Sequence, residues 1–274
     1  MTEHSPSRLT PGQSVENGRA EDVARHLPEE TPVALVYQVT TQAVMMATPA
    51  DLDDFAVGFS LSEGNVDAVS EIESLEILLH DGGIEARMWL SAAKAERFQA
   101  RRRSMLGPVG CGLCGIDSLG AALRDLPAVS SNLSFEDVDI AAAVTALRDH
   151  QPLHDQTRAV HAAGFWRPGT GLVAVREDVG RHNALDKLIG ALARSDEDGG
   201  SGAVILTSRV SVEMVQKTAM LGAAVIVAVS APTAQALRVA AAANIAVVAN
   251  ARGERFDVFL PDGSDAEKGN SNVT

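Results

Sequence analysis

Three aliphatic runs in the second half of the chain constrain its fold more than any other feature. They read "AVILT", "AVIVAVS" and "IAVVA", at residues 203–207, 224–230 and 245–249. Strands that are covered on both faces have this composition, because neither face meets water. Segments with helical periodicity alternate with these runs, at residues 183–193, 209–221 and 232–243. This alternation predicts a mostly parallel sheet packed between helices.

The predicted fold class is α/β, with a C-terminal cytidine-deaminase-like three-layer α/β/α domain over residues 121–261. A hairpin of strands 159–165 and 171–176 precedes the alternating segments, and a strand at 256–260 follows them. This order of elements matches the cytidine-deaminase fold, and an open flavodoxin-like sheet is the alternative.

The chemistry of the zinc deaminases is not predicted for this domain. Those enzymes carry H-x-E at one helix start and P-C-x-x-C at the next. Here Ala184 occupies the place of the glutamate near His182, and the segment "TSRVSVEMVQK" at the next helix start has no cysteine. Function therefore has to be argued from other residues, since a fold alone does not carry it.

A smaller α+β domain is predicted over residues 30–103. Strands 32–39 and 42–48 are close enough to pair, and Thr48 is placed to cap a helix that contains Phe55. A hairpin around Asp81 and a helix that ends near Arg103 complete this unit. Residues 1–29 and 262–274 are charged, turn-rich and aperiodic, so both ends are predicted to be disordered tails.

The net charge and the apolar segments exclude several classes of partner. A formal charge of −13 and a pI of about 4.9 argue against a protein that binds duplex nucleic acid, which needs clustered Lys and Arg. The N-terminus has no secretory signal, and no run reaches the roughly 18 apolar residues that cross a bilayer. We therefore expect a cytoplasmic protein without a membrane partner, with a homodimer as the default oligomer.

Both cysteines of the chain, Cys111 and Cys114, lie in the glycine-rich segment "SMLGPVGCGLCGIDSLG" at 104–120. In a reducing cytosol, a C-x-x-C pair points to metal binding or thiol chemistry. Zinc needs four ligands, so a zinc site would need a second subunit or nearby histidines. The candidates for that role are His150, His154 and His161.

Thiol chemistry leaves two alternatives for this segment. A thioredoxin-type couple sits at a helix start after a strand, and the glycine-rich flanks fit that poorly. A nucleophilic cysteine that moves between a donor and an acceptor gains from a mobile loop, and the predicted mobile segment is 104–120. The arginines at 101–103 would favour a thiolate, although cations at a helix C-terminus have the same appearance.

Polar residues follow the predicted parallel strands. In open α/β sheets ligands bind at the carboxyl ends of strands, where helix N-termini offer free N–H groups to anions. The segments that begin at Thr207 and Ser230, and "NARGER" at 250–255, lie at such ends. An ordinary hairpin turn with two exposed arginines explains "NARGER" slightly better on its residues alone. Likewise, Asp178, Arg181 and His182 before a helix could form a site or a simple capped helix start.

Five blocks of the sequence together resemble one family, the formate dehydrogenase accessory sulfurtransferases. The blocks are "PVALVY" (32–37), "DLDDFAVGFSLSEG" (51–64), "RRRSMLGPVGCGLCG" (101–115), "EDVGRHNALDKL" (177–188) and "TSRVSVEMVQKTAMLG" (207–222). They occur in order from about residue 30 to residue 260. The resemblance is far more specific than C-x-x-C alone.

The resemblance implies a sulfur carrier. A cysteine desulfurase would load sulfane sulfur onto Cys111 as a persulfide, and Cys114 would aid its release. The acceptor would be the molybdenum of bis-molybdopterin guanine dinucleotide, a cofactor that formate dehydrogenase needs in its sulfurated form. No resident metal is implied. The expected cofactor-binding residues are His182, Ser208, Arg209, Ser211, Asn250, Ala251, Arg252, Gly253, Glu254 and Arg255.

Overall fold

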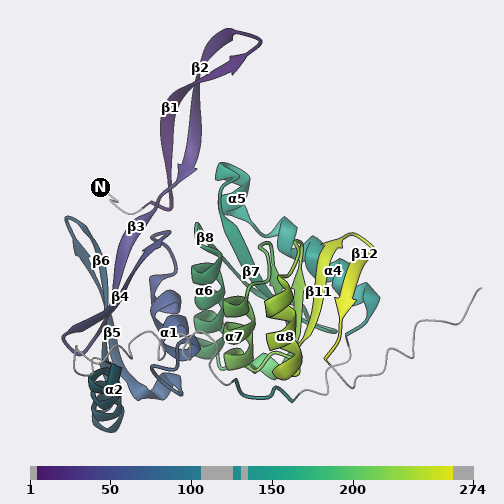
Figure 1. Cartoon of the computed structure of the whole chain (residues 1–274). Coiled ribbons are helices and arrows are strands. Elements are labelled where there is room, and N and C mark those ends of the chain that lie inside the picture. The colour runs from purple at the N-terminus through teal and green to yellow at the C-terminus, as the bar shows by residue number, and fades with distance from the viewer. Residues whose placement is uncertain (1–4, 106–125, 131–134, 262–274) are drawn as a thin grey trace, which may run out of the picture.

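The computed structural model describes residues 5–105, 126–130 and 135–261, which form two α/β units and a projecting hairpin (Figure 1). The segment with Cys111 and Cys114 and the predicted tail at 262–274 lie outside the described residues. No helix in the described ranges combines the length and apolar character needed to cross a membrane.

The N-terminal unit is a four-stranded sheet with two helices. Its strand order is β4-β3-β6-β5, and β3 and β6 are parallel neighbours that join two hairpins. The aromatic side chains of Tyr37 and Phe55 and the thioether of Met88 are fully buried in its core. The elements are β3 (Thr31–Tyr37), β4 (Thr40–Ala47), α1 (Leu52–Ser62), a 3-10 turn (Val69–Glu71), β5 (Ile72–His80), β6 (Gly83–Leu90) and α2 (Ala92–Met105).

The C-terminal unit has a six-stranded sheet in the order β12-β11-β10-β9-β7-β8, in which β9, β10 and β11 are parallel. The predicted alternation is confirmed. The elements are α4 (Asp137–Asp149), α5 (Pro152–Thr157), β7 (His161–Arg167), β8 (Gly171–Asp178), α6 (Arg181–Arg194), a 3-10 turn (Gly199–Ser201), β9 (Ala203–Leu206), α7 (Val212–Leu221), β10 (Val225–Ala228), α8 (Ala234–Ala242), β11 (Ala246–Arg252) and β12 (Arg255–Phe259).

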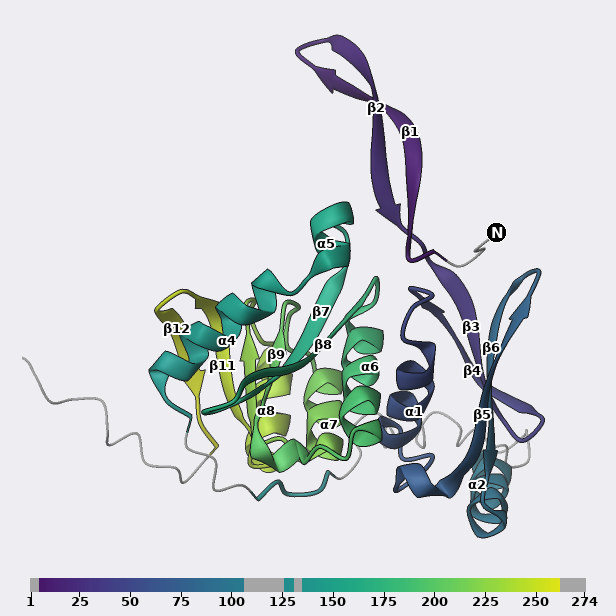
Figure 2. The same cartoon turned by 180° about the vertical axis from the view of Figure 1, so that it is seen from behind.

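The apolar strands are buried because helices cover both faces of this sheet (Figures 1 and 2). Val204 and Leu206 of β9 pack with α6, α7 and α8, whereas Ile205 between them packs with α4 on the opposite face. This arrangement has three layers, and the mixed α/β fold is confirmed. Its specific likeness to the cytidine-deaminase fold stays a prediction.

Helices α1 and α6 join the two units through a glycine crossing. A Cβ atom on Gly58 would lie 1.7 Å from the carbonyl oxygen of Asp186, and one on Gly190 would lie 1.9 Å from that of Asp54. Only glycine allows the two backbones to approach this closely. The relative position of the units is therefore fixed by a backbone contact.

Buried charges surround this crossing. Lys217 of α7 reaches Asp186 at 2.9 Å and Glu63 at 2.7 Å, and Ser62 donates to Asp186 at 2.6 Å. Burial raises the pKa of Asp186. Burial also lowers the pKa of Lys217, but the carboxylates of Asp186 and Glu63 outweigh this effect and raise it. Lys217 therefore keeps its positive charge in the cluster.

The predicted start of α1 is wrong. The helix begins at Leu52 after Asp51, which has a left-handed backbone and makes no side-chain cap. Thr48 does not cap it, because the C-terminal unit engages all three of its polar groups. Its N–H donates to Asp178 at 2.9 Å, its hydroxyl accepts from the N–H of Val179, and its carbonyl accepts from Lys187.

The predicted disordered tail at 1–29 is also wrong for most of its length. Residues Ser7–Glu16 and Arg19–Pro28 form strands β1 and β2 of an antiparallel hairpin, with Asn17 and Gly18 at its turn. Both turn residues have positive φ angles, 50° and 80°, which Asn and Gly adopt readily. The charged composition concealed a regular two-stranded ribbon.

Candidate ligand-binding site

The carboxyl ends of β9, β10 and β11 bring the three predicted polar segments together at one edge of the sheet. The N–H of Val229 donates to Leu206, and the N–H of Asn250 donates to Ser230 at 3.2 Å. Val210 and Pro232 form a parallel bridge that joins the first two segments. The segments that follow the three strands are therefore neighbours in space, as the topology predicts.

The first residues of β7 and α6 complete this edge, and Arg181 on α6 brings a positive charge to it. His161 pairs in register with Asp178, the last residue of β8, and Arg181 begins α6 three residues later. The pKa of His161 lies below its usual value because its ring is partly buried and because Arg181, His154 and His182 surround it with positive charge. The site therefore favours a negatively charged ligand.

Arg181 has a side-chain N–H group that a ligand could engage. Among the described residues, its Nε is the buried side-chain polar atom without a hydrogen-bond partner. Asp178, three residues before Arg181 in the chain, already accepts from Thr48 and Gly180 and pairs with Lys187 at 2.7 Å. Because a buried N–H without a partner costs about 1–3 kcal/mol, an anion that accepted from Arg181 would remove this cost.

His182 occupies the adjacent position on α6. Its Nε2 lies 2.9 Å from a carboxylate oxygen of Glu213, which also accepts from the hydroxyl of Ser211 at 3.3 Å. Both predicted residues are therefore at the edge and are linked through one glutamate that the sequence had not suggested. An incoming anion has to compete with Glu213 for them.

The loop after β9 holds two of the predicted residues, Ser208 and Arg209, and only one of them is exposed. Ser208 is only 3% exposed, and its hydroxyl donates to the carbonyl of Arg209 at 3.1 Å, so it supports the loop. The side chain of Arg209 is exposed. Of the two, Arg209 can reach a ligand.

The segment 250–255 contains the end of β11, the two-residue turn and the first residue of β12, so the expected hairpin geometry is present. Arg252 and Arg255 pair across it and both are exposed, whereas Ala251 is buried and can offer only its backbone. Asn250 has a left-handed backbone and donates to Asp257 at 2.7 Å. The remaining residues of the segment, Gly253 and Glu254, are exposed at the tip.

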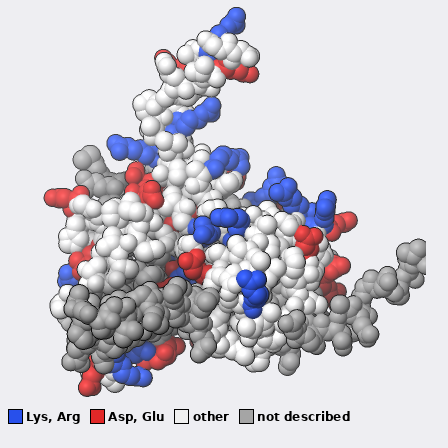
Figure 3. Space-filling model, viewed as in Figure 1, with Lys and Arg blue, Asp and Glu red and all other residues white. Residues whose placement is uncertain are grey.

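Lysine and arginine side chains gather along the upper rim of the C-terminal unit, where these strands end (Figure 3). No group of three or more histidine, cysteine or acidic side chains suited to a metal ion occurs in the described ranges. His161 is not among the cofactor-binding residues expected from the sequence. Its pairing with Asp178 is a long-range contact that a single strand pattern does not reveal.

Fold and edge together define a two-domain α/β protein with a candidate ligand-binding edge at the carboxyl ends of its parallel strands. The chain belongs to the FdhD/NarQ family, whose family model matches residues 28–263. It is 55% identical over 236 residues to the sulfur carrier protein FdhD of Agrobacterium fabrum, covering 86% of this chain and 87% of the relative. The corresponding protein of Brucella abortus is 56% identical over 240 residues, covering 87% and 89%.

A solved structure supports the same assignment. The crystal structure of a protein described as a formate dehydrogenase accessory protein, from Desulfotalea psychrophila, matches with a TM-score of 0.75 at 25% identity. The match covers 93% of this chain and 97% of that protein. The resemblance predicted from the five sequence blocks is thereby confirmed.

Proposed function

We propose that the protein is a cytoplasmic sulfur carrier that receives sulfane sulfur on Cys111 and delivers it to a molybdenum cofactor for formate dehydrogenase. The observation that carries this proposal is the identity of 55–56%, over most of the chain, to relatives named sulfur carrier proteins. The glycine-rich C-x-x-C segment suits a thiol that has to meet two different partners.

Loading is a thiol exchange. The Cys111 thiolate attacks the terminal sulfur of a cysteine desulfurase persulfide, the donor S–S bond breaks, and the donor cysteine leaves as a thiolate. A new S–S bond forms on Cys111, and no external oxidant is needed. Release of that sulfur as sulfide takes two electrons, which Cys114 supplies by attacking Cys111 and forming a disulfide with it.

The acceptor, bis-molybdopterin guanine dinucleotide, carries pyrophosphate groups and guanine bases. Arg181 and Arg209 are suited to its phosphates, since arginine binds phosphate through two parallel hydrogen bonds. Arg252 and Arg255 are suited to phosphate or to stacking on a base. The geometry of the edge thus supports a nucleotide-bearing substrate, although the chain as a whole is acidic.

Intact-protein mass spectrometry tests the sulfur step. After incubation with a cysteine desulfurase and cysteine, the protein should gain about 32 Da, one sulfur, and lose it with reductant. Cys111→Ala should abolish the gain, and Cys114→Ala, the matched control in the same loop, should retain it. A gain that persists in Cys111→Ala would contradict the assignment of the carrier.

The alternative hypotheses for the C-x-x-C pair predict different results in the same samples. A cofactor-binding chaperone without sulfur chemistry would show no gain in the unmodified protein. A zinc-bridged dimer would contain about half a zinc ion per chain when purified without chelator.

The ligand-binding edge gives a second prediction. Arg181→Ala should weaken the binding of guanosine diphosphate roughly 10- to 100-fold in calorimetry, because a hydrogen bond to a charged group contributes about 1.5–3 kcal/mol. Arg97→Ala removes an exposed arginine of the N-terminal unit and serves as the control, with unchanged affinity. Equal affinities in the two variants would place the nucleotide elsewhere.

A further inference from the structure

Glu213, the second residue of α7, places a carboxylate at the candidate ligand-binding edge. Its Oε2 lies 2.9 Å from Nε2 of His182 on α6 and accepts from the hydroxyl of Ser211 at 3.3 Å. Arg181 directly precedes His182, and Arg209 lies on the loop that leads to α7. A ligand at this point of the edge therefore meets both signs of charge.

The contacts of Glu213 hold its carboxylate without using all of its acceptor capacity. The side chain is 60% exposed, so it is open to a ligand. Both contacts are made by Oε2, and Oε1 has no hydrogen bond within the described residues. Because a carboxylate has about four acceptor positions, roughly two remain. A group that fills them has to donate two hydrogen bonds.

The proposed acceptor molecule contains one group of this kind, the guanine base. Its phosphate oxygens accept hydrogen bonds and carry negative charge, so a carboxylate repels them. Guanine has two adjacent donors on its Watson–Crick edge, N1–H and the 2-amino group. Adenine has an acceptor, N1, in place of the first of these donors. A carboxylate at this position therefore attracts guanine and rejects adenine.

Glu254 is the other exposed carboxylate of the edge, at the tip of the turn between β11 and β12. In the part of the chain that the structure describes, its side chain has no hydrogen bond or ion pair. Recognition of a base requires an acceptor that is held in place by its neighbours. The contacts with His182 and Ser211 give Glu213 this property.

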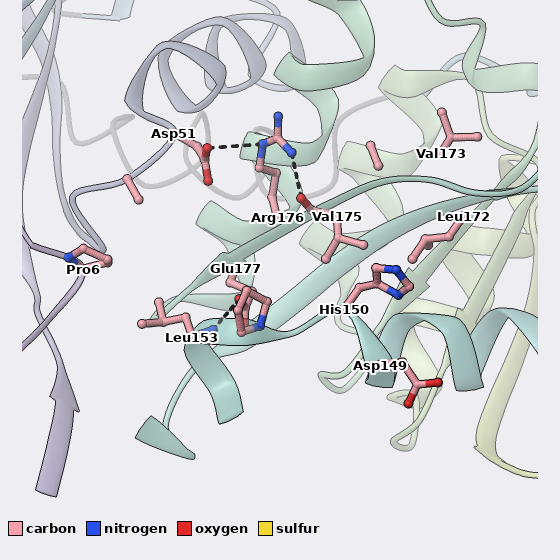
Figure 4. A pocket seen from close by; sticks show the side chains of 13 residues that line it. Pro6, Asp51, Asp149, His150, Leu153, Leu172, Val173, Val175, Arg176 and Glu177 are labelled. Carbon is pink, nitrogen blue, oxygen red and sulfur yellow. Dashed lines mark hydrogen bonds and ion pairs between the residues drawn. The ribbon is translucent and has the colours of Figure 1, made fainter. Parts of the chain in front are cut away.

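The cleft along β8, with a volume of about 600 Å³, offers no comparable acceptor (Figure 4). Of the carboxylates that line it, Glu177 accepts from backbone N–H groups of α5 through both of its oxygens. Asp51 lies 3.7 Å from the guanidinium of Arg176. Asp149 is exposed and has no hydrogen bond or ion pair among the described residues. The cleft is therefore less suited than the edge to recognise guanine.

We propose that Glu213 is the specificity-determining residue of the ligand-binding edge, and that its carboxylate selects guanine by accepting from N1–H and the 2-amino group of the base. This inference rests on the proposed function, from which it takes the guanine-bearing ligand. His182 and Ser211 act as positioning residues, because they touch Glu213 and hold its carboxylate.

Calorimetry with diphosphates that differ only in the base tests the selection on the unmodified protein. Guanosine diphosphate should bind about 10-fold more tightly than inosine diphosphate, which lacks the 2-amino group. Adenosine diphosphate should bind more weakly than both, because it presents neither donor. Equal affinities for the guanosine and adenosine nucleotides would overturn the selection and leave the phosphate contacts of the proposed function in place.

Glu213→Gln keeps the size of the side chain and replaces one acceptor with a donor. It should weaken the binding of guanosine diphosphate roughly 10- to 100-fold. It should strengthen the binding of xanthosine diphosphate, whose 2-carbonyl accepts from the new amide. Inorganic pyrophosphate, which has no base, should bind the variant at least as tightly as the unmodified protein. Glu73→Gln, at an exposed glutamate of β5 in the N-terminal unit, is the matched control and should change no affinity.

Three other outcomes would overturn the role of Glu213. If Glu213→Gln bound guanosine diphosphate and pyrophosphate more tightly in equal measure, Glu213 would only compete with phosphate. The same preference for guanine in Glu213→Gln and Glu73→Gln would mean that another group selects the base, and a preference lost only in Glu254→Gln would identify that group. An unmodified protein that binds neither guanosine diphosphate nor pyrophosphate would contradict the ligand-binding edge of the proposed function as well.

Discussion

Gly190→Ala is expected to lower the free energy of unfolding by about 3 kcal/mol or more, because the added Cβ would meet backbone. It would lie 1.9 Å from the carbonyl oxygen of Asp54 and 2.7 Å from its carbonyl carbon. No flexible side chain can move aside, so helices α1 and α6 must separate. In a chain of this size the melting temperature should fall by roughly 6–12 °C in a thermal scan.

The comparison with Gly82→Ala isolates the helix crossing. A Cβ on Gly82 meets nothing within 4 Å, so this variant makes the same chemical change without a clash and should melt close to the unmodified protein. Gly82 lies in the turn between β5 and β6. In an uncrowded helix, a glycine-to-alanine change stabilises a protein by up to about 1 kcal/mol, so a loss of stability in Gly190→Ala has to come from the helix crossing. A Gly190→Ala protein that melts at or above the temperature of the Gly82→Ala protein would contradict the close crossing.

The sequence predicted the C-terminal unit well because its signals are local. The runs that became β9, β10 and β11 are apolar wherever they are placed in the chain, and the helices between them have a clear periodicity. The β1–β2 hairpin was missed for the opposite reason. Charged and turn-forming residues interrupt the alternation along its strands, so the local pattern indicates a tail rather than a ribbon.

Features that depend on distant residues were beyond local patterns. The start of α1 was misplaced because Thr48 is held by Asp178, 130 positions away. The glycines at 58 and 190 are unremarkable until the two helices are known to cross. At the ligand-binding edge, the strand ends were predictable from topology, whereas the role of His161 required the register between β7 and β8.

Polar groups also hold the two units together. Arg176 of β8 reaches Asp54 of α1 at 2.7 Å, and Asn183 of α6 donates to the carbonyl of Met46 at 2.8 Å. Such contacts specify one geometry, because each donor has to meet one acceptor. Together with the glycine crossing, they fix the ligand-binding edge relative to the N-terminal unit.

Lys187→Met is expected to cost about 3–5 kcal/mol in the free energy of unfolding, the usual effect of removing one partner from a buried ion pair. Lys187 and Asp178 lie 2.7 Å apart with both side chains fully buried, and Lys187 also donates to the carbonyl of Thr48 at 2.9 Å. Methionine nearly preserves the volume, so the loss would come from the carboxylate left without its cation. Chemical denaturation monitored by circular dichroism measures it.

A double-mutant cycle separates charge from packing in this pair. Asp178→Asn combined with Lys187→Met leaves no buried charge, so its loss of unfolding free energy should be smaller than the sum of the two single losses by about 1 kcal/mol or more. Thr48 donates to one oxygen of Asp178 and Gly180 to the other, so the single amide oxygen of asparagine can keep one of these two hydrogen bonds, and that loss is common to the Asp178→Asn variant and the double variant. Strictly additive losses would mean that the two charges do not stabilise one another.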